Sequence, residues 1–164
     1  MRSNRNRGLF IIWIILSLSA LCSCGKSADI SEYADDPITI SGLLDEEFTI
    51  TPAELLALTC VSRTATGKTA KAGTVSATGP LLDTFLAQYG FVPTDFEKIR
   101  FIAGDGYKTV LKGTYLTDYE VVLVVSSGEE PLAESLRPLR LLIPGAESNM
   151  WIYAVVRIEF EPAE

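Results

Sequence analysis

A short apolar run that follows a basic N-terminal segment limits which part of this chain can form a folded domain. Arg2, Arg5 and Arg7 precede an uninterrupted run of apolar or small residues from 9 to 21. The run is shorter than the ~20 residues that a membrane-spanning helix needs. A basic start, a short apolar run and small residues after it are typical of a cleaved signal peptide. We therefore expect residues 1–23 to be removed.

The residues that follow this run predict a lipid anchor. Leu21-Cys22-Ser23-Cys24-Gly25 resembles a bacterial lipobox, with a Leu three residues before the cysteine and a small residue just before it. We expect lipidation at Cys24, with Cys22 as the second choice, and a protein held by its lipid on the extracytoplasmic face of the cell membrane. Cys60 then has no partner for an intrachain disulfide.

The charge of the mature chain excludes one class of partner. Removal of the three arginines leaves eleven basic residues against twenty-one acidic residues, which moves the formal charge from -7 to -10. A protein of this charge repels nucleic acid phosphates, so nucleic acid is not an expected partner. The length of the mature chain is that of one domain.

The first residues of the mature chain differ in composition from the rest. Residues 24–37 are polar and acidic, with Asp29, Glu32, Asp35 and Asp36 among them. Such a segment has little apolar surface to bury, and we expect it to be an acidic tether. The folded domain is then expected at 38–164.

Alternating and β-branched runs predict a domain made mostly of strands. Thr51-Pro52-Ala53-Glu54 is a capping box that opens a short helix through Leu58, and Gly79-Pro80 precedes a second helix over 81–89. Asp105-Gly106 predicts a hairpin with Asp105 first in a type I′ turn and Tyr107 packing across the strands. The expected class is α+β, a mixed β-sheet domain with two or three short helices. Strands are expected at 38–43, 48–50, 61–66, 74–78, 99–103, 107–111, 121–125, 139–143 and 151–160.

The chain contains no histidine. This excludes Ser-His-Asp and Cys-His nucleophile systems and every histidine-ligated metal site. We assign no catalytic residue from the sequence.

A series of short motifs carries a resemblance to a known family. In order along the chain are Gly79 with Leu81-Leu82-Asp83-Thr84-Phe85-Leu86, then Asp105-Gly106-Tyr107, then the segment 136–145 (LRPLRLLIPG), then Arg157-Ile158-Glu159-Phe160. This series resembles the oxidoreductase molybdopterin-binding domain, which has the sulfite-oxidase-like fold, in the compact version of bacterial secreted proteins. The resemblance covers residues 38–160.

The resemblance implies a cofactor site that this chain does not reproduce. In the family, a pterin dithiolene and one cysteine thiolate hold molybdenum, while basic residues and backbone amides hold the pterin phosphate. The family cysteine corresponds here to about Thr66 or Gly67, and a lysine of the closing strand corresponds to Tyr153. Cys60 stands some six residues before the expected position.

Three residues remain as candidates, and two of them have two interpretations. Cys60 is a small buried residue, or a molybdenum ligand under the alternative function. Arg140 is a strand residue that faces outward and pairs with an acid, or an anion contact in the former cofactor cleft. Arg63 is the other candidate for contact with a cofactor or another anion.

The sequence supports three functional hypotheses. The first is a domain without a cofactor that binds a small anionic ligand or an envelope protein. The second is an active molybdenum-cofactor oxidoreductase that binds molybdopterin, uses Cys60 as metal ligand and receives electrons from a partner protein. The third is a structural lipoprotein without a ligand.

Overall fold

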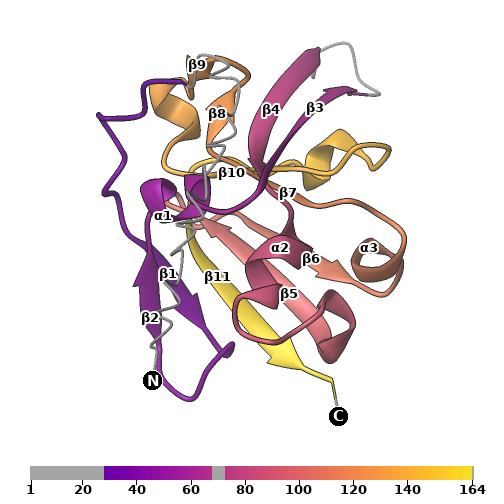
Figure 1. Cartoon of the computed structure of the whole chain (residues 1–164). Coiled ribbons are helices and arrows are strands. Elements are labelled where there is room, and N and C mark those ends of the chain that lie inside the picture. Colours follow the sequence, from indigo (N-terminus) through magenta and orange to yellow (C-terminus); the bar gives the residue numbers. More distant parts are fainter. Residues whose placement is uncertain (1–27, 68–72, 164) are drawn as a thin grey trace, which may run out of the picture.

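A five-stranded mixed sheet forms one layer of the domain. The computed structural model describes residues 28–67 and 73–163 (Figure 1). The strand order is β2-β1-β11-β5-β6, in which β1 and β11 are parallel and the other neighbours are antiparallel. The bounds are β1 Ile38–Ser41, β2 Phe48–Ile50, β5 Phe96–Ala103, β6 Lys108–Lys112 and β11 Val155–Pro162.

The second group of strands lies above this sheet in Figure 1. A four-stranded sheet has the order β3-β4-β8-β9, and β10 pairs with β7. The amide of Val125, just after β7, donates to the Thr78 carbonyl of β4, which joins the two groups. The bounds are β3 Cys60–Thr66, β4 Thr74–Pro80, β7 Val122–Val124, β8 Ser126–Ser127, β9 Glu130–Pro131 and β10 Arg140–Leu142.

Three short α-helices and three single 3₁₀ turns complete the described part of the chain. The helices are α1 Pro52–Leu56, α2 Leu82–Ala87 and α3 Thr114–Thr117, and the 3₁₀ turns are η1 Pro93–Asp95, η2 Glu134–Leu136 and η3 Ser148–Met150. The predicted α+β class is therefore confirmed. Within the described ranges, no helix is both long enough and apolar enough to cross a membrane.

Helix α1 begins where the sequence predicts. The Thr51 hydroxyl accepts from the Glu54 amide at 3.2 Å, and the Glu54 carboxylate accepts from the Thr51 amide at 2.8 Å. This reciprocal pair is the predicted capping box, and it satisfies two amides that the helix leaves without a partner. The helix ends at Leu56, slightly before the predicted end.

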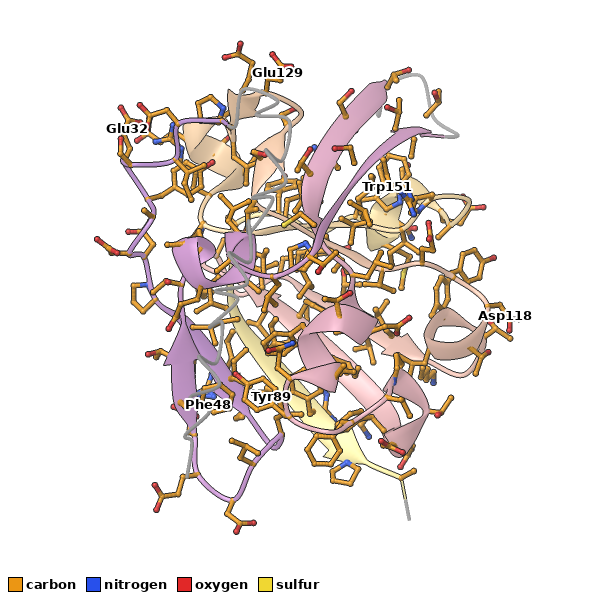
Figure 2. The ribbon with its side chains drawn as sticks, in the orientation of Figure 1. Glu32, Phe48, Tyr89, Asp118, Glu129 and Trp151 are labelled. Carbon is orange, nitrogen blue, oxygen red and sulfur yellow. The ribbon has the colours of Figure 1, made fainter. Side chains whose placement is uncertain are left out.

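The inner face of the five-stranded sheet forms the core. Alternate residues such as Ile40, Phe101 and Ile158 are fully buried. Helix α2 covers this face, and its Phe85 stacks against Phe160 of β11 with ring centroids 6.4 Å apart. Figure 2 shows Phe48 and Tyr89 side by side at the rim of this layer, with ring centroids 5.4 Å apart.

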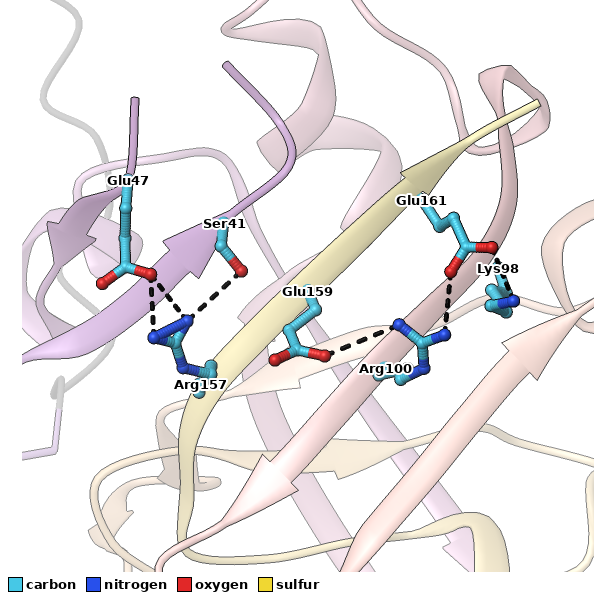
Figure 3. Close-up of polar contacts among 7 residues, drawn as sticks. All are labelled: Ser41, Glu47, Lys98, Arg100, Arg157, Glu159 and Glu161. Atoms are coloured by element: carbon cyan, nitrogen blue, oxygen red, sulfur yellow. Dashed lines mark hydrogen bonds and ion pairs between the residues drawn. The ribbon is translucent and has the colours of Figure 1, made fainter. Parts of the chain in front are cut away.

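The outer face of the same sheet carries charged side chains that pair across the strands. Figure 3 shows Arg157 of β11 bound to Glu47, and Arg100 of β5 between Glu159 and Glu161. The side chains of these pairs are about one third to one half exposed, and pairs that water reaches contribute little to stability. The alternation of apolar and charged residues along β5 and β11 thus reflects one buried and one solvated face.

The described part of the predicted tether belongs to the packed domain. Tyr33 is 1% exposed and Ile30 is 9% exposed. The Tyr33 hydroxyl donates to the Val125 carbonyl at 2.8 Å and accepts from the Leu132 amide at 2.9 Å. The prediction that residues 24–37 form a tether is therefore wrong from Ala28 onward, because one buried aromatic residue anchors the segment. Residues 24–27 lie outside the described residues.

The closing strand begins later than predicted. Strand β11 starts at Val155, whereas the sequence predicted a strand from 151. The segment before it runs beside β10, where the Leu141 amide donates to the Ile152 carbonyl. Ala154 then has a φ of 53°, which is incompatible with a continuous strand.

Candidate ligand-binding site

A cavity of about 290 Å³ lies between the turn that joins β5 to β6 and the segment that leads into β11. Trp151, which belongs to this segment, lies far from Phe48 and Tyr89 in Figure 2. One wall consists of Ala103, Asp105 and Tyr107, and the other of Ser148, Asn149, Trp151, Ile152 and Tyr153.

The β5–β6 turn fixes the first wall. The Asp105 carboxylate accepts from the Tyr107 amide at 2.9 Å, and the Ala103 amide donates to the Tyr107 carbonyl at 2.9 Å. The hairpin is confirmed, but the predicted type I′ turn is wrong. That turn needs a positive φ at both central residues, and here Gly106 has one and Asp105 does not.

Tyr107 does not pack between the strands as predicted. Its side chain is 54% exposed, and its hydroxyl donates to the Asn149 carbonyl at 3.4 Å. The ring therefore stands at the cavity, where it connects the first wall to the second.

The second wall depends on a buried tryptophan and a left-handed alanine. The Trp151 indole N–H donates to the Ile143 carbonyl at 2.9 Å. Ala154 donates its amide to the Leu136 carbonyl, and its carbonyl accepts from the Gly104 amide at 3.0 Å. A left-handed conformation is unfavourable for alanine, so the surroundings must impose it. It sets the direction of the preceding Tyr153, which is 53% exposed.

Arg140 of β10 lies beside the second wall, because the amide of the next residue, Leu141, donates to the Ile152 carbonyl. The Arg140 Nε atom is buried without a hydrogen bond, and Arg140 forms no ion pair with any described residue. Burial lowers the pKa of Arg140, while a Coulombic interaction with the Tyr153 hydroxyl opposes this shift. An arginine remains protonated in proteins, so a partly buried positive charge lacks a counterion in the described structure.

Arg63 does not join Arg140 at the cavity. Its guanidinium forms a bidentate pair with Glu120, in which both N···O distances are 2.8 Å. Bidentate geometry is the strongest arrangement of such a pair, and it occupies the donors that would contact an anion. The sequence could not show this, because Glu120 is far from Arg63 in the chain.

Cys60 also does not line the cavity. It is the first residue of β3, and its thiol lies 3.8 Å from the Leu55 carbonyl and 3.9 Å from the Leu56 carbonyl at the end of α1. Burial raises the pKa of the Cys60 thiol, which disfavours the thiolate that binds metals.

The other end of β3 holds the position that corresponds to the family cysteine. The Thr66 hydroxyl lies 3.0 Å from the Thr74 hydroxyl of β4. Six residues at about 3.3 Å per residue place Cys60 about 20 Å from Thr66 along the strand. Among the described residues, no cluster of three or more His, Cys, Asp or Glu could hold a metal ion.

Sequence reasoning identified two residues of this region and missed the others. The sequence singles out the positions of Arg140 and Tyr153, and the structure brings these two residues together. For Asp105 and Tyr107 the sequence predicts only a turn and packing across the strands. Ser148, Asn149 and Trp151 carried no recognisable signal, because their role depends on the turn opposite them.

The fold is a mixed two-layer α+β domain with a cavity between a hairpin turn and the segment that leads into the closing strand. The model of the oxidoreductase molybdopterin-binding domain family matches residues 27–164. The chain belongs to this family, which confirms the resemblance to the oxidoreductase molybdopterin-binding domain.

A solved structure has a similar fold. The chain is similar to the sulfane dehydrogenase SoxCD from Paracoccus pantotrophus, with 22% sequence identity and a TM-score of 0.62. The similarity covers 78% of this chain and 38% of the SoxCD chain, so it concerns the fold of one part of that protein. The search of curated proteins found no match.

Proposed function

We propose that this domain is a ligand-binding module of the cell envelope that does not hold molybdenum. The observation that carries the proposal is that the cysteine thiol and the unpaired arginine lie at different places in the fold. The one thiol in the described residues lies at the α1 end of β3, whereas the unpaired cation lies beside the cavity at Tyr153.

The residues present do not fit the family cofactor. A dithiolene-bound molybdenum atom needs a protein ligand within bonding reach, and soft thiolate is the ligand expected for it. Thr66 offers a neutral hydroxyl that is already engaged with Thr74. Cys60 would have to move by most of the length of β3, and such a shift would break the pairing of β3 with β4 from Cys60 to Thr66.

The charges at the cavity also favour a smaller ligand. A pterin phosphate in a dry cleft needs several cations or amides to compensate it. Of the two arginines proposed as anion contacts, Arg63 is committed to Glu120 and Arg140 alone is unpaired. One guanidinium suits one small anionic group, such as a carboxylate.

Elemental analysis tests this proposal against the active oxidoreductase with Cys60 as metal ligand. The wild type and Cys60→Ser are expressed in a host that makes molybdopterin, purified and analysed for molybdenum. We expect background molybdenum in both proteins, because the Cys60 thiol lies at the end of α1 and Thr66, at the position of the family cysteine, has no thiol. Near-equimolar molybdenum in the wild type that disappears in Cys60→Ser would establish the oxidoreductase instead.

We also propose that the domain is displayed on the extracytoplasmic face of the membrane by lipid on Cys24. The support is the order of the basic start, the apolar run and the lipobox-like residues in the sequence. These residues lie outside the described part of the chain. A single lipid chain gives weak binding, so stable anchoring requires more than one acyl chain on the cysteine.

Acyl labelling tests the anchor. Cys24→Ala is expected to abolish incorporation of a labelled fatty acid, since the modified thiol is removed. The control is Cys22→Ala, which should be labelled like the wild type. Undiminished labelling of Cys24→Ala would contradict the assignment of this cysteine.

A further inference from the structure

We propose that the cavity binds a small zwitterion of the betaine class, with its quaternary ammonium between Tyr107 and Tyr153 near Asp105 and its carboxylate at Arg140. This inference rests on the proposed ligand-binding function and specifies the chemistry of the ligand.

The lining of the cavity favours a cation. Asp105 is the one charged residue in the lining, and it forms no ion pair with a described residue. One of its oxygens accepts from the Tyr107 amide, which leaves acceptor capacity on the other. An anion alone placed here would face this carboxylate without compensation.

The aromatic residues indicate which kind of cation. The rings of Tyr107 and Tyr153 are each more than half exposed, one on each wall of the cavity. Trp151 also lines the cavity, but it is 4% exposed and its indole N–H donates to the Ile143 carbonyl, so it offers no free donor. Faces of aromatic rings attract cations, and quaternary ammonium groups are the ligands that such arrangements recognise.

Arg140 is the residue that would recognise the carboxylate of the ligand. The Leu141 amide donates to the Ile152 carbonyl, so the preceding residue, Arg140, lies beside the wall that Ile152 and Tyr153 form, and its Nε atom is buried there without a hydrogen bond. A cation alone would leave this guanidinium without a counterion. A molecule that carries both charges satisfies Asp105 and Arg140 together.

The size of the cavity restricts the ligand further. Its volume of about 290 Å³ is at the lower end of the range for small-molecule sites. Glycine betaine, a trimethylammonium group one methylene from a carboxylate, is the simplest probe of this class.

Calorimetric titration of the detergent-solubilised full chain tests the inference with three probes. Glycine betaine carries both charges, 3,3-dimethylbutanoate replaces its nitrogen by carbon, and choline lacks the carboxylate. We expect glycine betaine to bind about tenfold more tightly than either other probe, which is the effect of one desolvated cation–π or ionic contact.

Variants assign each end of the probe. Asp105→Asn should lower the affinity for glycine betaine about tenfold and should not lower the affinity for 3,3-dimethylbutanoate. Arg140→Met should lower the affinity for both carboxylate probes and leave the affinity for choline unchanged. Asp118→Asn is the control, because Asp118 is an exposed carboxylate at the end of α3 and does not line the cavity.

The outcomes separate this inference from the proposed function. If glycine betaine and 3,3-dimethylbutanoate bind equally well and both lose affinity in Arg140→Met, the inference of a zwitterionic ligand is wrong. The domain would then be an anion-binding module. Absence of binding by glycine betaine would overturn the inference. Absence of molybdenum in the same preparation would still support a domain without the cofactor. Equimolar molybdenum would contradict both the proposed function and the betaine inference.

Discussion

Gly79→Ala is expected to lower the free energy of unfolding by at least about 3 kcal/mol, at or beyond the upper end for an overpacked site. A Cβ atom at Gly79 would lie 1.9 Å from the carbonyl oxygen and 2.8 Å from the carbonyl carbon of Leu123. Leu123 belongs to β7 and is fully buried. Backbone atoms cannot rotate away as a side chain does, so β4 and β7 would have to separate.

The matched control is Gly104→Ala. A Cβ atom there would have one neighbour within 4 Å, the Val156 side chain at 3.7 Å, which is an ordinary contact. We expect a change within about 1 kcal/mol, as for most exposed substitutions. Urea unfolding followed by circular dichroism measures both variants through their midpoints. A Gly79→Ala midpoint equal to that of Gly104→Ala would show that β4 and β7 are not in close backbone contact.

Gly79 illustrates which parts of the fold the sequence could predict. The sequence identified it as the residue before the second helix, and the helix is present as α2. The reason for the glycine is instead its contact with β7, more than forty residues later in the chain. Local signals such as the Thr51 capping box predict where an element begins, but they carry no information about which backbone will lie against it.

The domain boundary was mispredicted for a similar reason. Composition averages over a segment, and residues 24–37 are acidic on average. One tyrosine overrides that average, because the partners of the Tyr33 hydroxyl lie 92 and 99 residues away along the chain. No window of the sequence contains both Tyr33 and its partners.

The candidate site shows the same limit at smaller scale. Arg140 was recognised because it stands in a run of apolar residues, where a charge is unusual. Whether it pairs with one of the many acids could be decided only in three dimensions, and Arg63, not Arg140, forms such a pair. The cavity beside Arg140 lies between a turn and a segment more than forty residues later in the chain. The left-handed conformation of Ala154, which orients Tyr153, has no signature in the sequence.

Tyr33→Ala is expected to lower the free energy of unfolding by about 3 to 5 kcal/mol, the range for removal of a buried aromatic side chain. Three contacts are lost together. The hydroxyl bridges the Val125 carbonyl and the Leu132 amide, and the Arg137 guanidinium lies over the ring, 4.7 Å from its centroid. Arg137 also binds the Glu32 carboxylate and the Leu132 carbonyl, so the residue next to Tyr33 is held to the same place.

Tyr33→Phe separates the hydroxyl from the ring. It leaves the Leu132 amide and the Val125 carbonyl without this partner in a buried place, which costs about 1 to 3 kcal/mol. Tyr119→Phe is the control, because Tyr119 is 37% exposed and the change should be within about 0.5 kcal/mol. Chemical denaturation of the four proteins measures these differences. If Tyr33→Ala unfolds at the wild-type midpoint, residues 28–37 add no stability to the domain and act as the tether that their composition predicts.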